Sequence, residues 1–455
     1  MAGIGFELRR LIQKESLWGL VRAYAFAGVI SSGPWVLSIF GVMAIGVLSV
    51  GRVPSVDVRR FLVSVTYLMA GSLIATGGLQ LMFTRFVADC LFRKEEDAVL
   101  PSLLGAITVT SMGAGLVGCG ALFVLGGTLA YRLLMASSLV VLSASWMAVV
   151  LLSSLKDYRG VMGAFVLGYA TSFVAALVLR PFGLPGLLAG FTAGQVLLLV
   201  VMVGLVARRY PSRRLLELGF LDRRRAYASL GATGLLYNLG IWADKLLFWF
   251  TPGTSEPVLG PLRASIIYDI PIFLAYLSIV PGMAVFLVRA ETAFADAYDA
   301  FFAGVRDGEP LGALRARRDR LTLAVRQGLF DIFKIQGMTV LVLLLAAPRL
   351  LAAVHISQLY LQLFSVDLVG VGMQVLMLAM FNVLFYLDQR RAALLLAGAF
   401  AALNVGLTLA SQRAGPAFYG YGFSLATTLT SMAGLLVVSR KLDRLEVDTF
   451  MRSPG

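Results

Sequence analysis

The stretch LVGVGMQVLMLAMFNVLFYL, residues 368–387, contains no Asp, Glu, Lys or Arg. A helix needs about 20 mostly apolar residues to cross the hydrocarbon core of a bilayer. This stretch has that length and that composition, so we expect it to form a membrane-spanning helix. The rest of the sequence repeats the same pattern.

Further apolar runs of this kind lie on both sides of it. They cover residues 23–51, 61–84, 98–131, 133–155, 160–179, 181–207, 226–250, 270–288, 335–348, 392–412 and 414–439. The run at 335–348 is short and is expected to recruit flanking residues, and the run at 226–250 is interrupted by Asp244 and Lys245. The sequence therefore predicts an all-α polytopic membrane protein with about 12 transmembrane helices.

The composition excludes most other classes of protein. Hydrophobic residues make up 59% of the 455 residues and charged residues only 14%, whereas an ordinary soluble chain is roughly 25% charged. So little charge does not solvate the surface of a soluble enzyme of this size. The formal net charge is nevertheless +14, which in a soluble chain would indicate a nucleic-acid partner.

The position of the basic residues explains this charge without nucleic acid. If the N-terminus is cytoplasmic and the predicted spans alternate, 30 of the 39 Lys and Arg residues fall in inner segments and 8 in outer loops. Positive residues are enriched in cytoplasmic loops. We therefore expect both termini in the cytoplasm, an inner rim that attracts anionic lipids, and no nucleic-acid partner. Lys245 is the one basic residue inside a span.

The order of the runs predicts two halves. Arg22-Ala23-Tyr24-Ala25 opens the first span and Arg225-Ala226-Tyr227-Ala228 opens the seventh. The predicted parts are an amphipathic cytoplasmic segment, a six-helix bundle, a basic cytoplasmic linker, a second six-helix bundle and a cytoplasmic tail, at residues 1–20, 21–207, 208–225, 226–439 and 440–455. Residues 1–20 are equally compatible with a plain leader to the first span.

A charged stretch at residues 289–334 interrupts the second half. The turn signal Asp307-Gly308-Glu309-Pro310 separates an acidic arm from a basic arm. This pattern predicts a cytoplasmic helical hairpin, which either docks a partner enzyme or rests on anionic lipid.

The residue types needed for common catalytic sites are missing. His355 is the only histidine, and a lone histidine without a Cys or carboxylate cluster is a poor metal site. No lysine follows a glycine, so the Gly-Lys-Ser/Thr ending of a nucleotide-binding loop does not occur. The sequence predicts no enzyme activity, no metal and no cofactor, which leaves a transporter, a channel or a membrane scaffold.

The seventh span carries the strongest candidate site. Helical spacing places Asn238, Trp242, Lys245 and Trp249 on one face, with Asp244 turned about 100° away from Lys245. A charge inside a span suggests a functional site, and a cation, an amide and two aromatic rings suit sugar hydroxyls and rings along a substrate path. The alternative is a structural ion pair near the outer interface, with the two tryptophans as belt residues.

Proline residues mark two candidate bends. Ser31, Ser32 and Pro34 lie inside the first span, where proline frees backbone carbonyls. They are further candidates for the substrate path, either on a helix that bends during transport or at a static kink. Pro271 and Pro281 make the eighth span a second candidate for bending.

The remaining candidates lie at span ends and on one helix face. Four charged residues at span edges are gating or boundary candidates, with a boundary role favoured: Arg85, Asp89, Asp269 and Arg289. Gly186, Gly190 and Gly194 repeat every four residues in the sixth span. Such a small-residue face predicts close helix packing.

Three stretches carry a resemblance to a known family. They are MAGIGFEL at residues 1–8, ISSGPW at 30–35 and DKLLFW at 244–249. With these motifs the chain resembles, nearly end to end, the PelG family of membrane exporters of the Pel polysaccharide, which is similar to the polysaccharide-transporter branch of the MOP flippase superfamily.

The resemblance implies a function. It implies two six-helix bundles around a central cavity, and export of a galactosamine-rich exopolysaccharide of biofilms from cytoplasm to periplasm across the bacterial inner membrane. The path would lie between the bundles, by alternating access or as a continuous channel. The implied partners are a cytoplasmic PelF-like glycosyltransferase and PelD-like and PelE-like membrane proteins. Two other functions stay open: a small-molecule or drug exporter of the same superfamily, and a non-transporting scaffold for a polysaccharide synthase.

Overall fold

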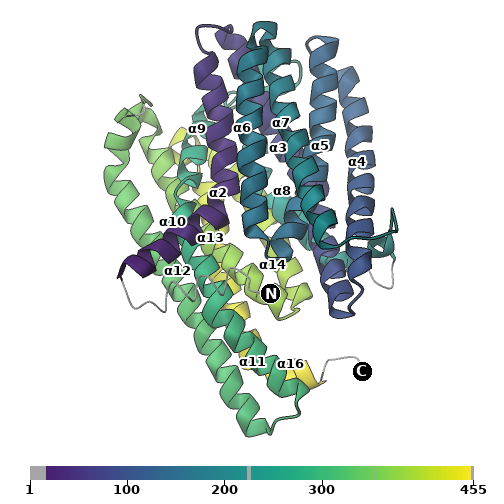
Figure 1. Cartoon of the computed structure of the whole chain (residues 1–455). Coiled ribbons are helices and arrows are strands. Elements are labelled where there is room, and N and C mark those ends of the chain that lie inside the picture. Colours follow the sequence, from purple (N-terminus) through teal and green to yellow (C-terminus); the bar gives the residue numbers. More distant parts are fainter. Residues whose placement is uncertain (1–16, 223–226, 354, 452–455) are drawn as a thin grey trace. The chain divides into compact units, whose positions relative to one another are not determined.

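The computed structural model describes residues 17–222, 227–353 and 355–451, and the predicted segment 1–20 lies almost entirely outside them. Nearly all of the described chain is helical (Figure 1). In the described residues, the two strands form one antiparallel hairpin, β1 (Glu256–Leu259) with β2 (Leu262–Ala264). The predicted all-α class is confirmed.

The helices before this hairpin follow the predicted apolar runs. They are α2 (Leu17–Ser49), α3 (Ser55–Phe92), η1 (Glu96–Ala98), α4 (Val99–Val124), α5 (Leu129–Ser154), α6 (Tyr158–Leu179), η2 (Arg180–Phe182), α7 (Gly183–Arg209), η3 (Gly219–Leu221) and α8 (Ala228–Phe250).

The helices after the hairpin include a broken span and a long helix. They are α9 (Ile266–Tyr276), α10 (Ile279–Arg289), the π-helical turn η4 (Ala290–Phe294), α11 (Ala295–Arg306), α12 (Leu311–Ala353), η5 (Gln358–Tyr360), α13 (Leu361–Tyr386), α14 (Arg390–Ala414), η6 (Pro416–Phe418), α15 (Tyr421–Asp443) and α16 (Leu445–Met451). The short run predicted at 335–348 does recruit its flanks, because it lies inside α12.

The protein is a multi-pass membrane protein. Within the described residues, 9 helical segments are long and apolar enough to cross a membrane, or 10 if the bent pair Val21–Pro34 and Val36–Ser49 of α2 counts as one span. One of the nine, Tyr158–Arg209, contains both α6 and α7. The helix α8, which carries Asp244 and Lys245, is not among them. The count of twelve spans in two halves remains a prediction.

The chain groups into two compact units. One consists of Gly33–Ile266, and the other of Met1–Ser32 together with Ile267–Gly455. The first unit includes α8, which packs along α3. The predicted bundles, divided at the basic linker 208–225, assign α8 to the second half instead. The compact units and the predicted halves therefore differ in the placement of this helix.

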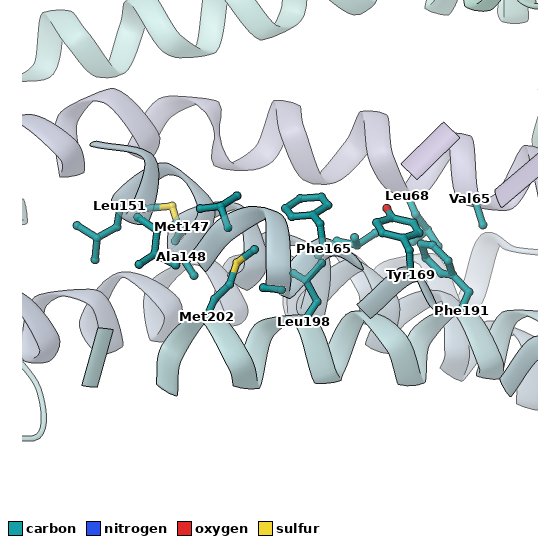
Figure 2. Close-up of a cluster of buried hydrophobic side chains, with 14 of the residues drawn as sticks. Val65, Leu68, Met147, Ala148, Leu151, Phe165, Tyr169, Phe191, Leu198 and Met202 are labelled. Atoms are coloured by element: carbon teal, nitrogen blue, oxygen red, sulfur yellow. The ribbon is translucent and has the colours of Figure 1, made fainter. Parts of the chain in front are cut away.

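A dense apolar cluster holds α3, α5, α6 and α7 together within the first unit (Figure 2). Val65 of α3, Met147 of α5, Phe165 of α6 and Phe191 of α7 are among its buried side chains. Lipid tails are as apolar as these side chains, so van der Waals contact rather than water exclusion stabilises such a cluster. The helices are therefore stabilised only where their side chains and backbones are in close van der Waals contact.

Glycines allow α6 and α7 to approach closely. A methyl group on Gly194 of α7 would lie 2.5 Å from the backbone nitrogen of Ser172 of α6, and one on Gly190 would overlap the backbone of Ala176. A methyl group on Gly186 would overlap the Leu179 carbonyl oxygen. The predicted packing role of these glycines is confirmed.

The second unit contains a helical hairpin. Helices α11 and α12 run side by side, joined by a turn at residues 307–310 in which Gly308 has a φ of +67° (Figure 1). The Arg317 guanidinium bonds to Glu309 and donates to the Ala300 carbonyl oxygen at 2.8 Å. On the tail, Glu446 of α16 pairs with Arg318 at 3.4 Å. Part of the predicted tail is thus a short helix that packs against α12.

We expect Gly194→Ala to lower the stability of the protein by about 1–3 kcal/mol, because a methyl group there overpacks the α6–α7 contact. Gly204→Ala is the matched control on α7, since a methyl group at Gly204 meets nothing within 4 Å. Thermal unfolding of the purified protein in detergent measures both. The packing argument would be contradicted by equal unfolding temperatures for the two variants.

Candidate functional site

The candidate site is built on the contact between α3 and α8. Gly77 and Gly78 of α3 face Gly231 and Gly234 of α8, and a methyl group on Gly231 would lie 2.7 Å from the Gly78 carbonyl oxygen. The two backbones therefore lie against each other. Asn238 lies at this contact: its Nδ2 donates to the Gly234 carbonyl oxygen at 2.9 Å, and a methyl group on Gly77 would approach it to 2.8 Å.

Asp244 and Lys245 form a buried ion pair about two helical turns beyond Asn238 on α8. Asp244 is 0% and Lys245 1% exposed. The Lys245 ammonium donates to the Asp244 carboxylate at 3.1 and 3.3 Å and to the Ile241 carbonyl oxygen at 3.0 Å. The two charges thus neutralise each other locally.

The predicted 100° separation around the helix does not keep the two charged groups apart. Side chains on a helix lean toward its N-terminus, and the lysine side chain is long enough to reach back to the preceding residue and to the carbonyl one turn earlier. The ammonium then has three hydrogen bonds without leaving the helix surface.

Aromatic rings lie beside Lys245 and stack on one another. The Lys245 Nζ lies 5.9 Å from the centre of the Trp242 ring, within cation–π range. Trp242 and Trp249 lie 6.2 Å apart between ring centres, and Trp249 stacks on Tyr67 of α3 at 4.5 Å. The Tyr67 hydroxyl donates to the Arg263 carbonyl oxygen at 2.9 Å, which ties the stack to β2.

The structure thus brings Trp242, Lys245 and Trp249 into one cluster on α8, and places Asn238 at the helix contact beside it. Both tryptophan rings are buried, and they pack against Ala70 of α3. A belt residue has its ring in the headgroup region instead. The arrangement offers an ammonium, a carboxylate and aromatic faces inside a membrane protein, where charged groups mark functional sites by default.

Two of the boundary candidates link α3 to the start of α8. Arg85 and Asp89 form an ion pair at 3.3 Å, one turn apart near the end of α3. The Tyr227 hydroxyl, just before α8, donates to Asp89 at 2.8 Å, and the Arg85 guanidinium lies 5.5 Å from the Tyr227 ring. These contacts describe a structural link between two helix ends.

The other two boundary candidates lie in the second unit. Arg289, at the end of α10, forms an ion pair with Asp331 of α12. Asp269 is half-buried in the first turn of α9, where a negative charge is favourable beside the helix N-terminus. A gating role for these four residues remains a prediction.

The bend predicted in the first span is present. Pro34 lies inside α2, whose two arms, Val21–Pro34 and Val36–Ser49, form a bent pair. The Ser32 hydroxyl donates to the Gly28 carbonyl oxygen at 2.6 Å and the Ser31 hydroxyl lies 3.5 Å from the same oxygen. Bonds of this type from Ser to the preceding turn bend helices. Whether the bend moves during transport stays a prediction.

Sequence reasoning missed Gln336. The eighth span is broken between α9 and α10, and Gln336 of α12 lies 2% exposed against the break. Its Oε1 accepts from the Gly282 N–H at 3.1 Å and its Nε2 donates to the Ser278 carbonyl oxygen at 3.1 Å. An intact helix would pair these two backbone groups with each other, so the amide is inserted into the helix ladder.

Pro281 lies in the first turn of α10, so the interruption of the eighth span falls beside one of its two prolines, and whether this span bends stays a prediction. A signal was available: Gln336 is a strongly polar side chain at the start of the apolar run 335–348. An amide in a span needs partners, and a proline-containing span supplies free backbone groups.

A second missed residue is Asp367, which is 0% exposed in α13. A methyl group on Gly420, the residue before α15, would lie 2.9 Å from the Asp367 Oδ1. The start of a helix favours a negative charge. Sequence reasoning missed Asp367 because it lies one residue outside the apolar run 368–387 and reads as a span end.

His355 is exposed in a turn with a φ of +56°. Across the described part of the chain, no three His, Cys, Asp or Glu side chains converge on a point where they could hold a metal ion.

We expect Lys245→Met to lower the stability by about 3 kcal/mol, because it leaves the Asp244 carboxylate buried without its partner. The double variant Asp244→Asn/Lys245→Met removes both charges and should recover most of that loss. Thermal unfolding in detergent measures both variants. A single variant as stable as the unmodified protein would contradict the ion-pair assignment.

We expect Gln336→Leu to lower the stability by about 1–3 kcal/mol, because two buried backbone groups at the α9–α10 break lose their partners. Gln327→Leu is the matched control, since Gln327 is exposed on the same helix. Unfolding temperatures compare the two, and an equal effect would show that the amide does not hold the break.

Comparisons with solved structures identify the fold. The chain is similar to an outward-facing multidrug resistance MATE family transporter of the MOP superfamily, with a TM-score of 0.63 and 13% identity, covering 93% of this chain and 96% of the other. It is similar to the inward-facing form of such a transporter, with a TM-score of 0.63 and 12% identity over 92% and 99%. A MOP superfamily transporter from Pyrococcus furiosus gives a TM-score of 0.60 and 15% identity over 93% and 96%.

Among curated protein sequences, none matches this chain. The family comparison does match: residues 1–450 fit the family PelG, described as "Putative exopolysaccharide Exporter (EPS-E)". That range takes in all three motifs of the resemblance and every described helix except the last residue of α16. With its MOP-type transporter fold and a match of this length, the chain belongs to the PelG exopolysaccharide exporter family.

Proposed function

We propose that the protein exports a galactosamine-rich exopolysaccharide, Pel, from the cytoplasm to the periplasm across the bacterial inner membrane, with both termini cytoplasmic and without catalytic chemistry of its own. Family membership supports the class of cargo, and the transporter fold supports transport rather than synthesis. Transport proceeds by alternating access or along a continuous path through twelve spans.

The observation that carries the proposal is the α8 cluster. An ammonium, a carboxylate and two indole rings lie together inside an apolar helix bundle. Aromatic faces suit sugar rings, and charged groups form stronger hydrogen bonds to hydroxyls than neutral groups do. Burying an ion pair costs desolvation free energy that apolar residues of the same volume would not cost. If these positions had only a structural role, apolar residues would stabilise the protein more.

The cluster is closed in this structure, because Lys245, Asp244 and Trp249 are each at most 1% exposed. The proposal therefore requires the polar face of α8 to become accessible during transport. The same chain has a bend at Pro34 in α2 and an interruption between α9 and α10.

The implied partners are a cytoplasmic PelF-like glycosyltransferase and PelD-like and PelE-like membrane proteins. A chain that is elongated on the cytoplasmic side can be driven outward by its own polymerisation or by an ion gradient. The hairpin of α11 and α12 is the part of the described chain most suited to docking a cytoplasmic enzyme, since its polar surface lies outside the apolar part of α12.

A second candidate is a drug exporter of the same superfamily. It is favoured by the fold similarity to multidrug transporters, which at 12–13% identity extends to the fold alone. A third candidate is a scaffold for a synthase, in which the hairpin holds the enzyme and no cargo passes.

We expect the stable double variant Asp244→Asn/Lys245→Met to reduce secreted polysaccharide at least about tenfold, the equivalent of losing one charged hydrogen bond to the cargo. Asn238→Ala should reduce it less, because its amide is bonded to its own helix. The measurement is secreted polymer at equal membrane expression. Leu235→Ala, a half-exposed position on α8, is the matched control.

Unchanged export from both variants would remove α8 from the cargo path. Altered drug resistance on deletion, with normal polymer secretion, would favour the second candidate. Loss of complex assembly on deletion of the hairpin, with normal export by the α8 variants, would favour the scaffold.

A further inference from the structure

An apolar groove of about 420 Å³ lies between α12, α13 and α15. Most of its lining is hydrocarbon, and its apolar residues include Phe330, Phe333, Met373, Leu376, Met432 and Leu435. Phe330 and Phe333 are 64% and 54% exposed, so two large rings are left uncovered along it. The groove is therefore open to a flexible apolar ligand from the side.

One end of the groove is polar. Arg326 and Ser439 line the groove there. Arg326 also lines a second depression of about 480 Å³, together with Arg318, Asp319, Thr322, Leu323 and Asp443. The apolar groove thus opens directly into a polar depression, with the Arg326 side chain at the junction.

Among the residues that line the groove, the polar side chains of both walls lie at the same end. On α12, Arg326 and Phe330 lie about 6 Å apart along the helix axis, and the charged residues that follow, Asp331 and Lys334, do not line the groove. On α15, Val438 is followed by Ser439 and the basic residues Arg440 and Lys441, and then by the buried Leu442, which also lines the groove. A membrane-spanning surface changes in this way where the hydrocarbon core meets the lipid headgroups.

The Arg326 guanidinium shares the polar depression with the carboxylates of Asp319 and Asp443 but is not paired with either. Arg326 is exposed, and within the described residues no hydrogen bond or ion pair holds its guanidinium. Arg318, two turns earlier, is different: it pairs with Asp319 at 2.8 Å and with Glu446 at 3.4 Å. A free guanidinium at the end of an apolar groove is complementary to a molecule with an anionic head and a hydrocarbon chain.

We propose that this groove binds an anionic phospholipid of the surrounding membrane, with one acyl chain along Phe330, Phe333 and Met432 and its phosphate against the Arg326 guanidinium and the Ser439 hydroxyl. Bound in this way, the lipid contacts α12, α13 and α15 at once and stabilises their packing. The proposal does not depend on the cargo, and its test measures lipid binding rather than export.

The test uses the full-length protein purified in detergent and native mass spectrometry. The probes are phosphatidylglycerol, which is anionic, and phosphatidylcholine with the same acyl chains, which carries no net charge. We expect the unmodified protein to retain phosphatidylglycerol preferentially. Arg326→Gln should weaken phosphatidylglycerol binding about fivefold, the usual effect of one basic residue at an anionic lipid surface, and abolish the preference.

Two matched controls separate the head from the chain. Arg320→Gln changes another exposed arginine of α12 that lines neither cavity, and should leave binding unchanged. Met432→Trp fills the groove and should weaken both lipids equally, whereas Leu436→Trp places the same ring at a 61% exposed position outside the groove and should have no effect.

Equal binding of the two lipids by the unmodified protein would overturn the proposal, as would equal losses in Arg326→Gln and Arg320→Gln. Displacement of the lipid by glycerol 3-phosphate alone would show a phosphate site without an acyl chain and would also overturn it. A dimer that dissociates on Met432→Trp would assign the groove to a second copy of the chain instead.

Discussion

Backbone N–H and C=O groups have no water to bond with inside a bilayer, and this constraint governs the whole molecule. It explains why the described chain is almost entirely helical, since a helix pairs its own backbone groups. It also explains what happens where a helix is interrupted. At the α9–α10 break, the Gly282 N–H donates to the Gln336 side-chain amide, and that amide donates to the Ser278 carbonyl oxygen. A membrane helix can be broken there because a side chain from another helix completes its hydrogen bonds.

Because lipid tails are as apolar as the helix surfaces, the hydrophobic effect does not drive the helices together inside the bilayer. The helices are instead held by close contact, and glycine sets how close they come. Gly190 and Gly194 allow α7 to lie against α6, and Gly77 and Gly234 allow α8 to lie against α3. The α3–α8 contact matters for the candidate site, because it positions Asn238 and brings Tyr67 onto Trp249.

In the candidate site, the buried charges are paired within a single helix. The Lys245 ammonium donates to Asp244 and to a carbonyl oxygen of its own helix, and it lies beside the Trp242 ring, which packs near Trp249. Since the two groups of this ion pair belong to the same helix, the pair stays together when α8 moves. This local pairing is compatible with a polar face that is covered in one state of a transporter and accessible in another.

The amino-acid sequence was enough to predict the class of the protein, because composition and the length of the apolar runs show which segments can cross a lipid bilayer. The bend at Pro34, the glycine face of α7 and the position of Lys245 inside a span could also be predicted from the sequence. The three family motifs added exopolysaccharide export as the expected function. The partners of particular side chains were decided only by the tertiary structure. Helical spacing separated Asp244 from Lys245, but the flexible lysine side chain reaches back to the carboxylate. In the sequence, Gln336 and Asp367 look like ordinary residues at the edges of spans. They are buried in the structure because residues of α10 and the start of α15 pack against them. Hydropathy depends on the residues of one segment, whereas burial and pairing depend on which segments meet.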